Sequence, residues 1–193
     1  MKQYKGLPLF EVVFSDEDSV FNNVAFVTAP AIEENFIRLS KQEDNEIKLS
    51  VDDEKRIVSG PALIPDMPIY RDQGGRKFYI TWTAETIKQM AISFFRNSRQ
   101  NAGNVEHQVP VNGITYFESY IIDKERGICP KEYENLPDGT WMLSAKVTND
   151  DVWNMVKDGS LTGFSIDVSN VQFKEEKEID TLEELLEYLN NNN

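Results

Sequence analysis

The chain has 193 residues, the length of about one domain, and a compact fold of this size buries roughly 70% of the surface that the unfolded chain exposes. Hydrophobic residues make up 40% of the sequence, which excludes an intrinsically disordered composition. The 33 acidic and 20 basic residues give a net charge of −13, which disfavours binding to nucleic acid or to an anionic membrane surface.

One cysteine, Cys129, and one histidine, His107, limit the chemistry available to the chain. A single thiol can form neither an internal disulfide nor a cysteine-based zinc site, so we predict no metal and no cofactor. The N-terminal sequence lacks the cleavage pattern of a signal peptide, and no apolar run reaches the roughly 18 residues of a membrane span. We therefore expect a cytoplasmic protein.

Apolar and β-branched runs predict strands along most of the chain. In chain order, the predicted strands cover residues 9–14, 24–27, 57–64, 78–82, 114–122, 141–147 and 161–168. Helices are predicted at 84–97, where Thr83 supplies the N-cap and apolar residues recur at helical spacing, and at 149–158. The Pro-, Asp- and Gly-rich segment 65–75 predicts a loop, and Gly60-Pro61 predicts a bulge or an edge.

Two charged segments shape the predicted domain organisation. Residues 40–56 are expected to form an exposed hairpin or connection, and residues 174–193 an acidic C-terminal helix or tail, after a domain that covers residues 1–173. Helices interrupt the strands without regular alternation. This order favours an α+β fold with a largely antiparallel or barrel-like sheet.

Two polar residues are candidates for chemistry. The imidazole of His107, in the sequence VEHQ, has an ordinary pKa that suits a general base. Strand alternation in GFSID places Gly163, Ser165 and Asp167 on one face, away from the apolar face. The G-x-S-x-G pattern of a nucleophile elbow fails, because Asp167 occupies the position of the second glycine. Taken alone, these residues fit an ordinary loop histidine and strand serine.

The order of several stretches adds a family resemblance. These stretches are VAFVTAPAIEENFIRLSK, VEHQ, ITYFESYI and GTWMLSAKVTNDDVWNMVKDGSLTGFSIDV. Over nearly all of residues 20–170 they resemble the phage prohead (capsid-maturation) protease group, specifically its XkdF-like branch, which is similar to herpesvirus assemblin. The resemblance implies a seven-stranded, mostly antiparallel β-barrel flanked by helices. It also implies a serine endopeptidase that cleaves phage major capsid and scaffold proteins inside the assembling procapsid, in the host cytoplasm, and that forms dimers or larger assemblies.

By the same resemblance, Ser165 is the nucleophile and His107 is the general base. Herpesvirus relatives use a second histidine, which this chain lacks, so a carboxylate is expected as the third member. Glu118, in the sequence FESY, is the first choice, and Asp167 is the second. The alternative function is a catalytically silent structural protein of the procapsid, in which His107 and Ser165 would lie too far apart for a hydrogen bond.

Overall fold

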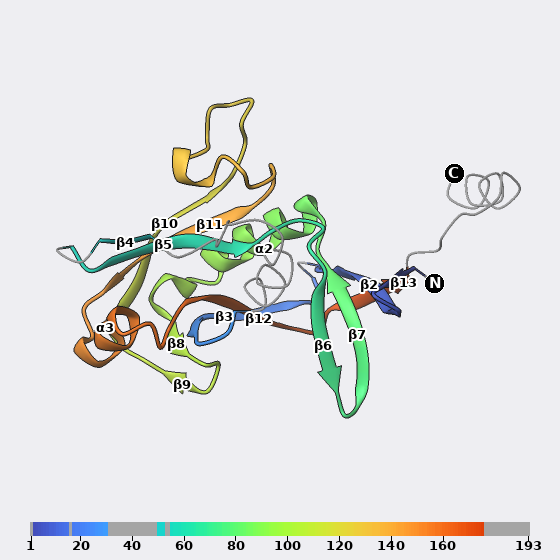
Figure 1. The fold of residues 1–193 in the computed structure, drawn as a ribbon, viewed down its shortest axis with the longest axis horizontal. Helices are drawn as coiled ribbons and strands as arrows, with labels where there is room; N and C mark the ends of the chain where they lie inside the picture. Colours follow the sequence, from blue (N-terminus) through green and yellow to red (C-terminus); the bar gives the residue numbers. More distant parts are fainter. Residues whose placement is uncertain (1, 16, 31–49, 53–54, 176–193) are drawn as a thin grey trace, which may run out of the picture.

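The computed structural model describes residues 2–15, 17–30, 50–52 and 55–175, and within them thirteen strands form three sheets (Figure 1). The first sheet contains β1 (Gln3–Tyr4), β2 (Leu7–Val13), β7 (Arg76–Thr81), β6 (Ile69–Gln73) and β13 (Gln172–Glu175). The second contains β10 (Ile114–Ile121), β11 (Trp141–Val147), β5 (Ile57–Leu63) and β4 (Ser50–Asp52). The third contains β12 (Gly163–Ser169), β3 (Val20–Val27), β8 (Gly103–Val105) and β9 (Val109–Pro110).

The pairing pattern confirms the α+β class and its mostly antiparallel sheets. Of the ten pairings between described strands, only β2–β7 and β3–β8 are parallel. The predicted seven-stranded barrel is wrong, because the described strands form three open sheets. The ladder between β5 and β4 ends at Ser59, and β5 and β12 belong to different sheets. The irregularity predicted at Gly60-Pro61 is present as a register shift opposite Trp141 and Met142.

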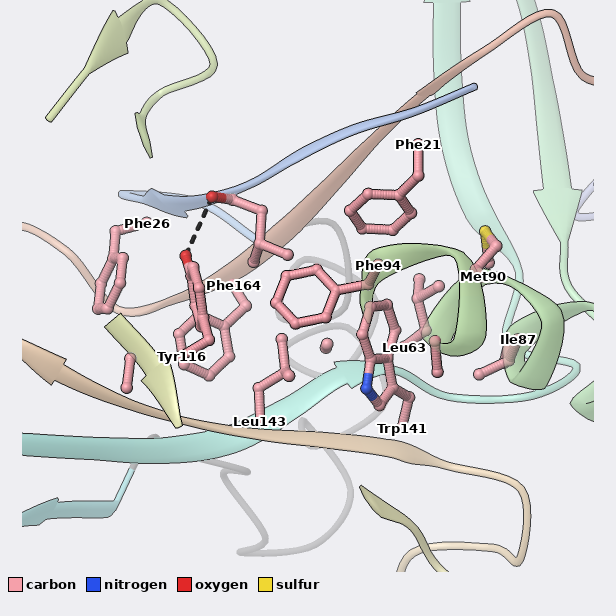
Figure 2. Close-up of a cluster of buried hydrophobic side chains, with 14 of the residues drawn as sticks. Phe21, Phe26, Leu63, Ile87, Met90, Phe94, Tyr116, Trp141, Leu143 and Phe164 are labelled. Carbon is pink, nitrogen blue, oxygen red and sulfur yellow. Dashed lines mark hydrogen bonds between the residues drawn. The ribbon is translucent and has the colours of Figure 1, made fainter. Parts of the chain in front are cut away.

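Aromatic side chains from the second and third sheets meet the helix α2 (Ala84–Arg96) in one core (Figure 2). The ring of Phe94 lies 5.7 Å from each of Phe21, Tyr116 and Trp141, in edge-on contacts that aromatic pairs favour. The hydroxyl of Tyr116 donates a hydrogen bond to the carbonyl of Val24 at 3.0 Å, so its buried polar atom is satisfied. This core fixes β3 against the strands of the second sheet.

The helices predicted at 84–97 and 149–158 are confirmed. Thr83 caps α2 by accepting from the Thr86 N–H at 3.2 Å. The second helix, α3 (Asp150–Lys157), begins after Asn149, whose side chain accepts from the Val152 N–H at 3.0 Å. Within the described residues, no helix is long and apolar enough to cross a bilayer.

The predicted loop at 65–75 is wrong in part, because it contains β6. This strand pairs with β7 through a hairpin whose turn residues, Gly74 and Gly75, both have positive φ values. Such a two-residue turn suits a hairpin, and glycine adopts its backbone angles without a steric cost. Figure 1 shows the hairpin projecting from the body of the molecule. Its inner part carries Arg71 toward the candidate site described below.

The charged segments are only partly described. Ser50–Asp52 forms β4, which pairs with β5, at the end of the predicted connection 40–56. Lys174 and Glu175 lie in β13, which pairs with β2, so the strand extends past the predicted domain end at residue 173. The predicted helix over the remaining residues, 176–193, lies outside the described part of the chain.

Candidate active site

The antiparallel ladder between β3 and β12 places Ser165 and Asp167 of β12 near Asn23 of β3. Ser165 pairs with Ala25, and Asp167 pairs with Asn23. Alternate residues of a strand share a face, so Ser165 and Asp167 lie on the face opposite to the buried Phe164. The methyl side chain of Ala25 leaves room beside Ser165 for a larger group from another strand.

A β-bulge on β3 sets the direction of Asn23. The register shifts after Asp167, and Val168 pairs with Phe21, so Asn22 is the extra residue. Phe21 and Val24 belong to the same core cluster although they are three residues apart, which strict alternation would place on opposite faces. The bulge therefore keeps both apolar side chains in the core and leaves Asn23 on the outer face.

The histidine enters from a tight turn after β8, which runs parallel to β3. Glu106 and His107 both have a φ of 54°, in the left-handed region that non-glycine residues rarely adopt. The Gln108 N–H donates to the carbonyl of Val105 at 3.1 Å and closes the turn. Backbone strain of this kind gathers at functional sites, where surrounding contacts hold it in place.

Glu106 supplies such contacts. Its Oε1 accepts from the backbone N–H of Thr28 at 2.6 Å, and its own N–H donates to the carbonyl of Phe26 at 3.0 Å. The turn is thereby held against the end of β3. This attachment fixes the backbone from which the His107 ring extends.

A continuous hydrogen-bonded series joins four side chains at this site. His107 Nε2 lies 2.8 Å from Ser165 Oγ, and His107 Nδ1 lies 3.1 Å from Asn23 Oδ1. Asn23 Nδ2 donates to Asp167 Oδ2 at 3.3 Å. Because the amide oxygen of Asn23 can only accept, Nδ1 carries the ring proton and Nε2 is left to accept the hydroxyl proton of Ser165. The arrangement can pass a proton from serine to histidine.

The surroundings of His107 favour its neutral form. Burial lowers the pKa of His107 below its ordinary value of 6.5, the charges of Asp167 and Glu106 raise it, and the charge of Arg71 lowers it further. Burial is the largest of these effects. The imidazole is therefore uncharged at neutral pH, as a general base must be.

A small hollow lies beside the serine. Its volume is about 20 Å³, roughly the space of one water molecule. The residues that line it are Ala62, Leu63, Ile69, Arg71, Trp82, Phe164, Ser165 and Ile166. Arg71 is the charged member of this otherwise mainly apolar set.

Gly163 lies two residues before Ser165 and packs against Pro30. A Cβ placed on Gly163 would lie 2.4 Å from Pro30 Cγ and 2.7 Å from Pro30 Cβ. The absence of a side chain at Gly163 therefore makes room for the ring of Pro30.

Replacing Gly163 with alanine is expected to destabilise the fold by about 1–3 kcal/mol, because the added methyl group overpacks the contact with Pro30. Urea denaturation of both proteins measures this difference. Pro30→Gly removes the contacted carbons, so adding G163A to that variant should cost less than adding it to the original chain. Equal costs in the two backgrounds would contradict the steric explanation.

The structure brings together His107, Ser165 and Asp167 but not Glu118. Glu118 Oε2 accepts from the hydroxyl of Ser144 at 2.5 Å, on the second sheet, while both ring nitrogens of His107 have other partners. The prediction that Glu118 reaches the imidazole is therefore wrong, because β10 returns along β11 and not along β8. Asp167, the second choice, contacts the imidazole only through Asn23.

Sequence reasoning missed Asn23 and Arg71. The signal for Asn23 was present in VFNNVAFV, where two amides interrupt an apolar strand. Such an interruption is costly in a buried strand unless the polar groups find partners. Arg71 was missed because its strand lies in the segment predicted as a loop.

A serine hydroxyl bonded to an imidazole, whose other nitrogen is oriented by an amide oxygen, is the arrangement of a nucleophilic acyl-transfer site. Residues 44–173 match the model of the family described as "Putative phage serine protease XkdF", and the chain belongs to this family. The matched region contains His107, Ser165 and Asp167, whereas Asn23 precedes it.

The chain is also similar to the phage-like element PBSX protein XkdF of Bacillus subtilis (strain 168). The two are 29% identical over 117 residues, which cover 61% of this chain and 38% of that protein. The chain thus spans well under half the length of this relative. No solved structure matches the chain, and the similarity to assemblin stays a prediction.

Proposed function

We propose that the protein is a serine endopeptidase that cleaves capsid and scaffold protein segments during phage prohead maturation. The observation that carries this proposal is the 2.8 Å contact between His107 Nε2 and Ser165 Oγ. Membership of a family described as a phage serine protease supports the reaction class and the phage context. The capsid and scaffold substrates, the procapsid location and the assembly into dimers or larger complexes are parts of the proposal.

The four hydrogen-bonded side chains have distinct roles in the proposed reaction. Ser165 Oγ attacks the peptide carbonyl carbon while His107 Nε2 accepts the hydroxyl proton. The proton on Nδ1 stays bonded to Asn23 Oδ1, and the carboxylate of Asp167 polarises the amide and stabilises the imidazolium. His107 then protonates the leaving amine, and water hydrolyses the acyl-enzyme by the reverse sequence of proton transfers.

Arg71 is placed to stabilise the charge that forms on the substrate. Arg71 lines the hollow beside Ser165, and its positive charge is the smallest of the four effects that shift the pKa of His107. A tetrahedral intermediate concentrates negative charge on the former carbonyl oxygen, next to the nucleophile. A fixed cation there lowers the energy of the transition state more than that of the bound substrate.

Arg71→Ala is expected to reduce kcat on the order of 10²- to 10³-fold, a typical loss when one group that stabilises an oxyanion is removed. Removing Arg71 also removes a charge that lowers the pKa of His107, so the acidic limb of the pH–rate profile should move to higher pH. Arg76→Ala, on the exposed end of the same hairpin, serves as the control and should leave both properties unchanged. An unaltered profile in the Arg71 variant would remove this residue from the mechanism.

The silent structural alternative makes a different geometric prediction, namely that His107 and Ser165 lie apart. The hydrogen bond between them favours the active enzyme. Labelling with a fluorophosphonate probe, read by peptide mass spectrometry, tests the nucleophile directly. Co-expression with the capsid and scaffold proteins of the same phage tests the substrates. Labelling at Ser165 without cleavage would leave a serine hydrolase with a different substrate, whereas absence of both would support the silent alternative.

A further inference from the structure

A second cavity, separate from the hollow at Ser165, lies on the second sheet. Its volume is about 490 Å³, within the range of small-ligand sites. The residues that line it are Ser59, Glu118, Tyr120, Gly127, Ile128, Cys129, Pro130, Glu132, Tyr133 and Ser144. None of them lines the hollow beside Ser165, and the proposed proteolysis uses none of them.

The cavity lies on the face of the second sheet that points away from the main core. Along β11, Trp141 and Leu143 belong to that core, whereas Met142 belongs to a separate apolar cluster with Ile122 and Tyr133. Ser144 shares the face of Met142 by strand alternation. The segment after β10 covers this face, and Figure 1 shows it projecting from the sheet on that side. Tyr133 belongs to both this apolar cluster and the cavity lining, so the cluster and the cavity adjoin each other.

Three side chains form a polarised series inside the cavity. The hydroxyl of Ser59 donates to Ser144 Oγ at 2.8 Å, and the hydroxyl of Ser144 donates to Glu118 Oε2 at 2.5 Å. A register shift between Tyr116 and Glu118 directs the carboxylate to this face. Among the described residues, Glu118 Oε1 has no hydrogen-bond partner, so the carboxylate is held in place by one oxygen and can accept from a ligand with the other.

The remaining lining adds a second carboxylate and two aromatic rings. Glu132 is the other acidic member, and no lysine, arginine or histidine is found in the lining. Burial raises the pKa of Tyr120 to about 12, with Glu118 contributing, so the phenol remains a neutral hydrogen-bond donor. Carboxylates that only accept, together with aromatic faces, select a ligand that donates hydrogen bonds and carries positive charge.

We propose that this cavity binds the guanidinium group of an arginine side chain. A planar guanidinium can donate to the carboxylates of Glu118 and Glu132 in two directions at once, which a compact ammonium group does less well. The cavity is roomy enough for the whole side chain. The same chemistry is offered by an arginine within a protein segment and by a free guanidinium compound.

The test uses the full chain labelled with ¹⁵N and two probes, N-acetyl-arginine methylamide and a seven-residue peptide with a central arginine. Both should give saturable chemical-shift changes at Gly127, Ile128 and Cys129. The matching citrulline compounds should bind at least about tenfold more weakly than the arginine compounds. Tighter binding of the peptide by about tenfold would identify a protein segment as the source. Equal affinity would identify a free guanidinium compound.

Glu118→Gln should weaken binding about tenfold, because it removes the charge while keeping the shape of the side chain. Glu85→Gln, which makes the same change on the exposed start of α2, should have no effect. Glu132→Gln is a second variant that should weaken binding while it leaves the hydrogen bonds among Ser59, Ser144 and Glu118 intact. Unchanged affinity in both Glu118 and Glu132 variants, equal binding of citrulline, or the absence of saturable shifts would overturn the proposal. Ser165→Ala should bind normally, so this result is independent of proteolysis.

Discussion

Ser165→Ala and His107→Ala are each expected to reduce proteolysis by about 10⁴-fold or more, because the nucleophile and its base act as one unit. Without the hydroxyl of Ser165 no acyl-enzyme forms. Without the imidazole, the hydroxyl proton loses its acceptor, His107 Nε2, which lies 2.8 Å from Ser165 Oγ. The measurement is the rate at which co-expressed capsid or scaffold protein is cleaved, followed by mass spectrometry. Combining both changes should cost little more than either alone.

Ser169→Ala provides the matched control, because Ser169 is an exposed serine at the end of the same strand. It should cleave at the original rate. Circular dichroism should show that all three variants keep their fold, since neither Ser165 nor His107 is fully buried. Full cleavage by either the Ser165 or the His107 variant would remove that residue from the proposed chemistry.

Asn23→Ala is expected to reduce kcat on the order of 10²- to 10⁴-fold without large loss of stability. Asn23 Oδ1 holds the proton of His107 on Nδ1, and enzymes that lose the group fixing this tautomer lose activity on that scale. Asn23 also separates the imidazole from Asp167, so the alanine variant interrupts the series at its centre. The rate of probe labelling at Ser165 measures the effect without knowledge of the cleavage site.

Asn23→Asp tests the same position through the pH dependence. A carboxylate beside Nδ1 still accepts the ring proton, so much of the activity should remain. Its negative charge favours the imidazolium and raises the pKa of His107, so the acidic limb of the pH–rate profile should move to higher pH. The original chain should keep its activity to lower pH, because burial lowers the pKa of His107. Identical profiles for the two proteins would contradict direct contact between this position and the imidazole.

The hydrogen bond between His107 and Ser165 could be predicted from the family resemblance, because matching motifs indicate which residues far apart in the sequence act together. Local patterning also predicted α2 with its cap and placed Ser165 on the face away from the core. The role of Asn23 depends on the register of β3 against β12 and on a bulge at Asn22, and neither is encoded in a local pattern.

The errors have similar physical causes. Glu118 was assigned to His107 on the assumption that the hairpin after the histidine folds back onto it, whereas β10 pairs with β11. The barrel was expected from the family, but closure depends on ladders between strand edges that single sequences do not reveal. Gly74-Gly75 was interpreted as part of a loop, although the same pair forms the turn of a hairpin.

The four side chains of the candidate site come from three distant stretches of the polypeptide. His107 is separated by 84 positions from Asn23 and by 58 from Ser165. A nascent chain on the ribosome therefore cannot form the hydrogen-bonded serine–histidine pair until β12 has been synthesised and paired with β3. For the protease proposed above, the time needed to translate residues 24–164 would therefore separate the synthesis of Asn23 from that of the nucleophile Ser165.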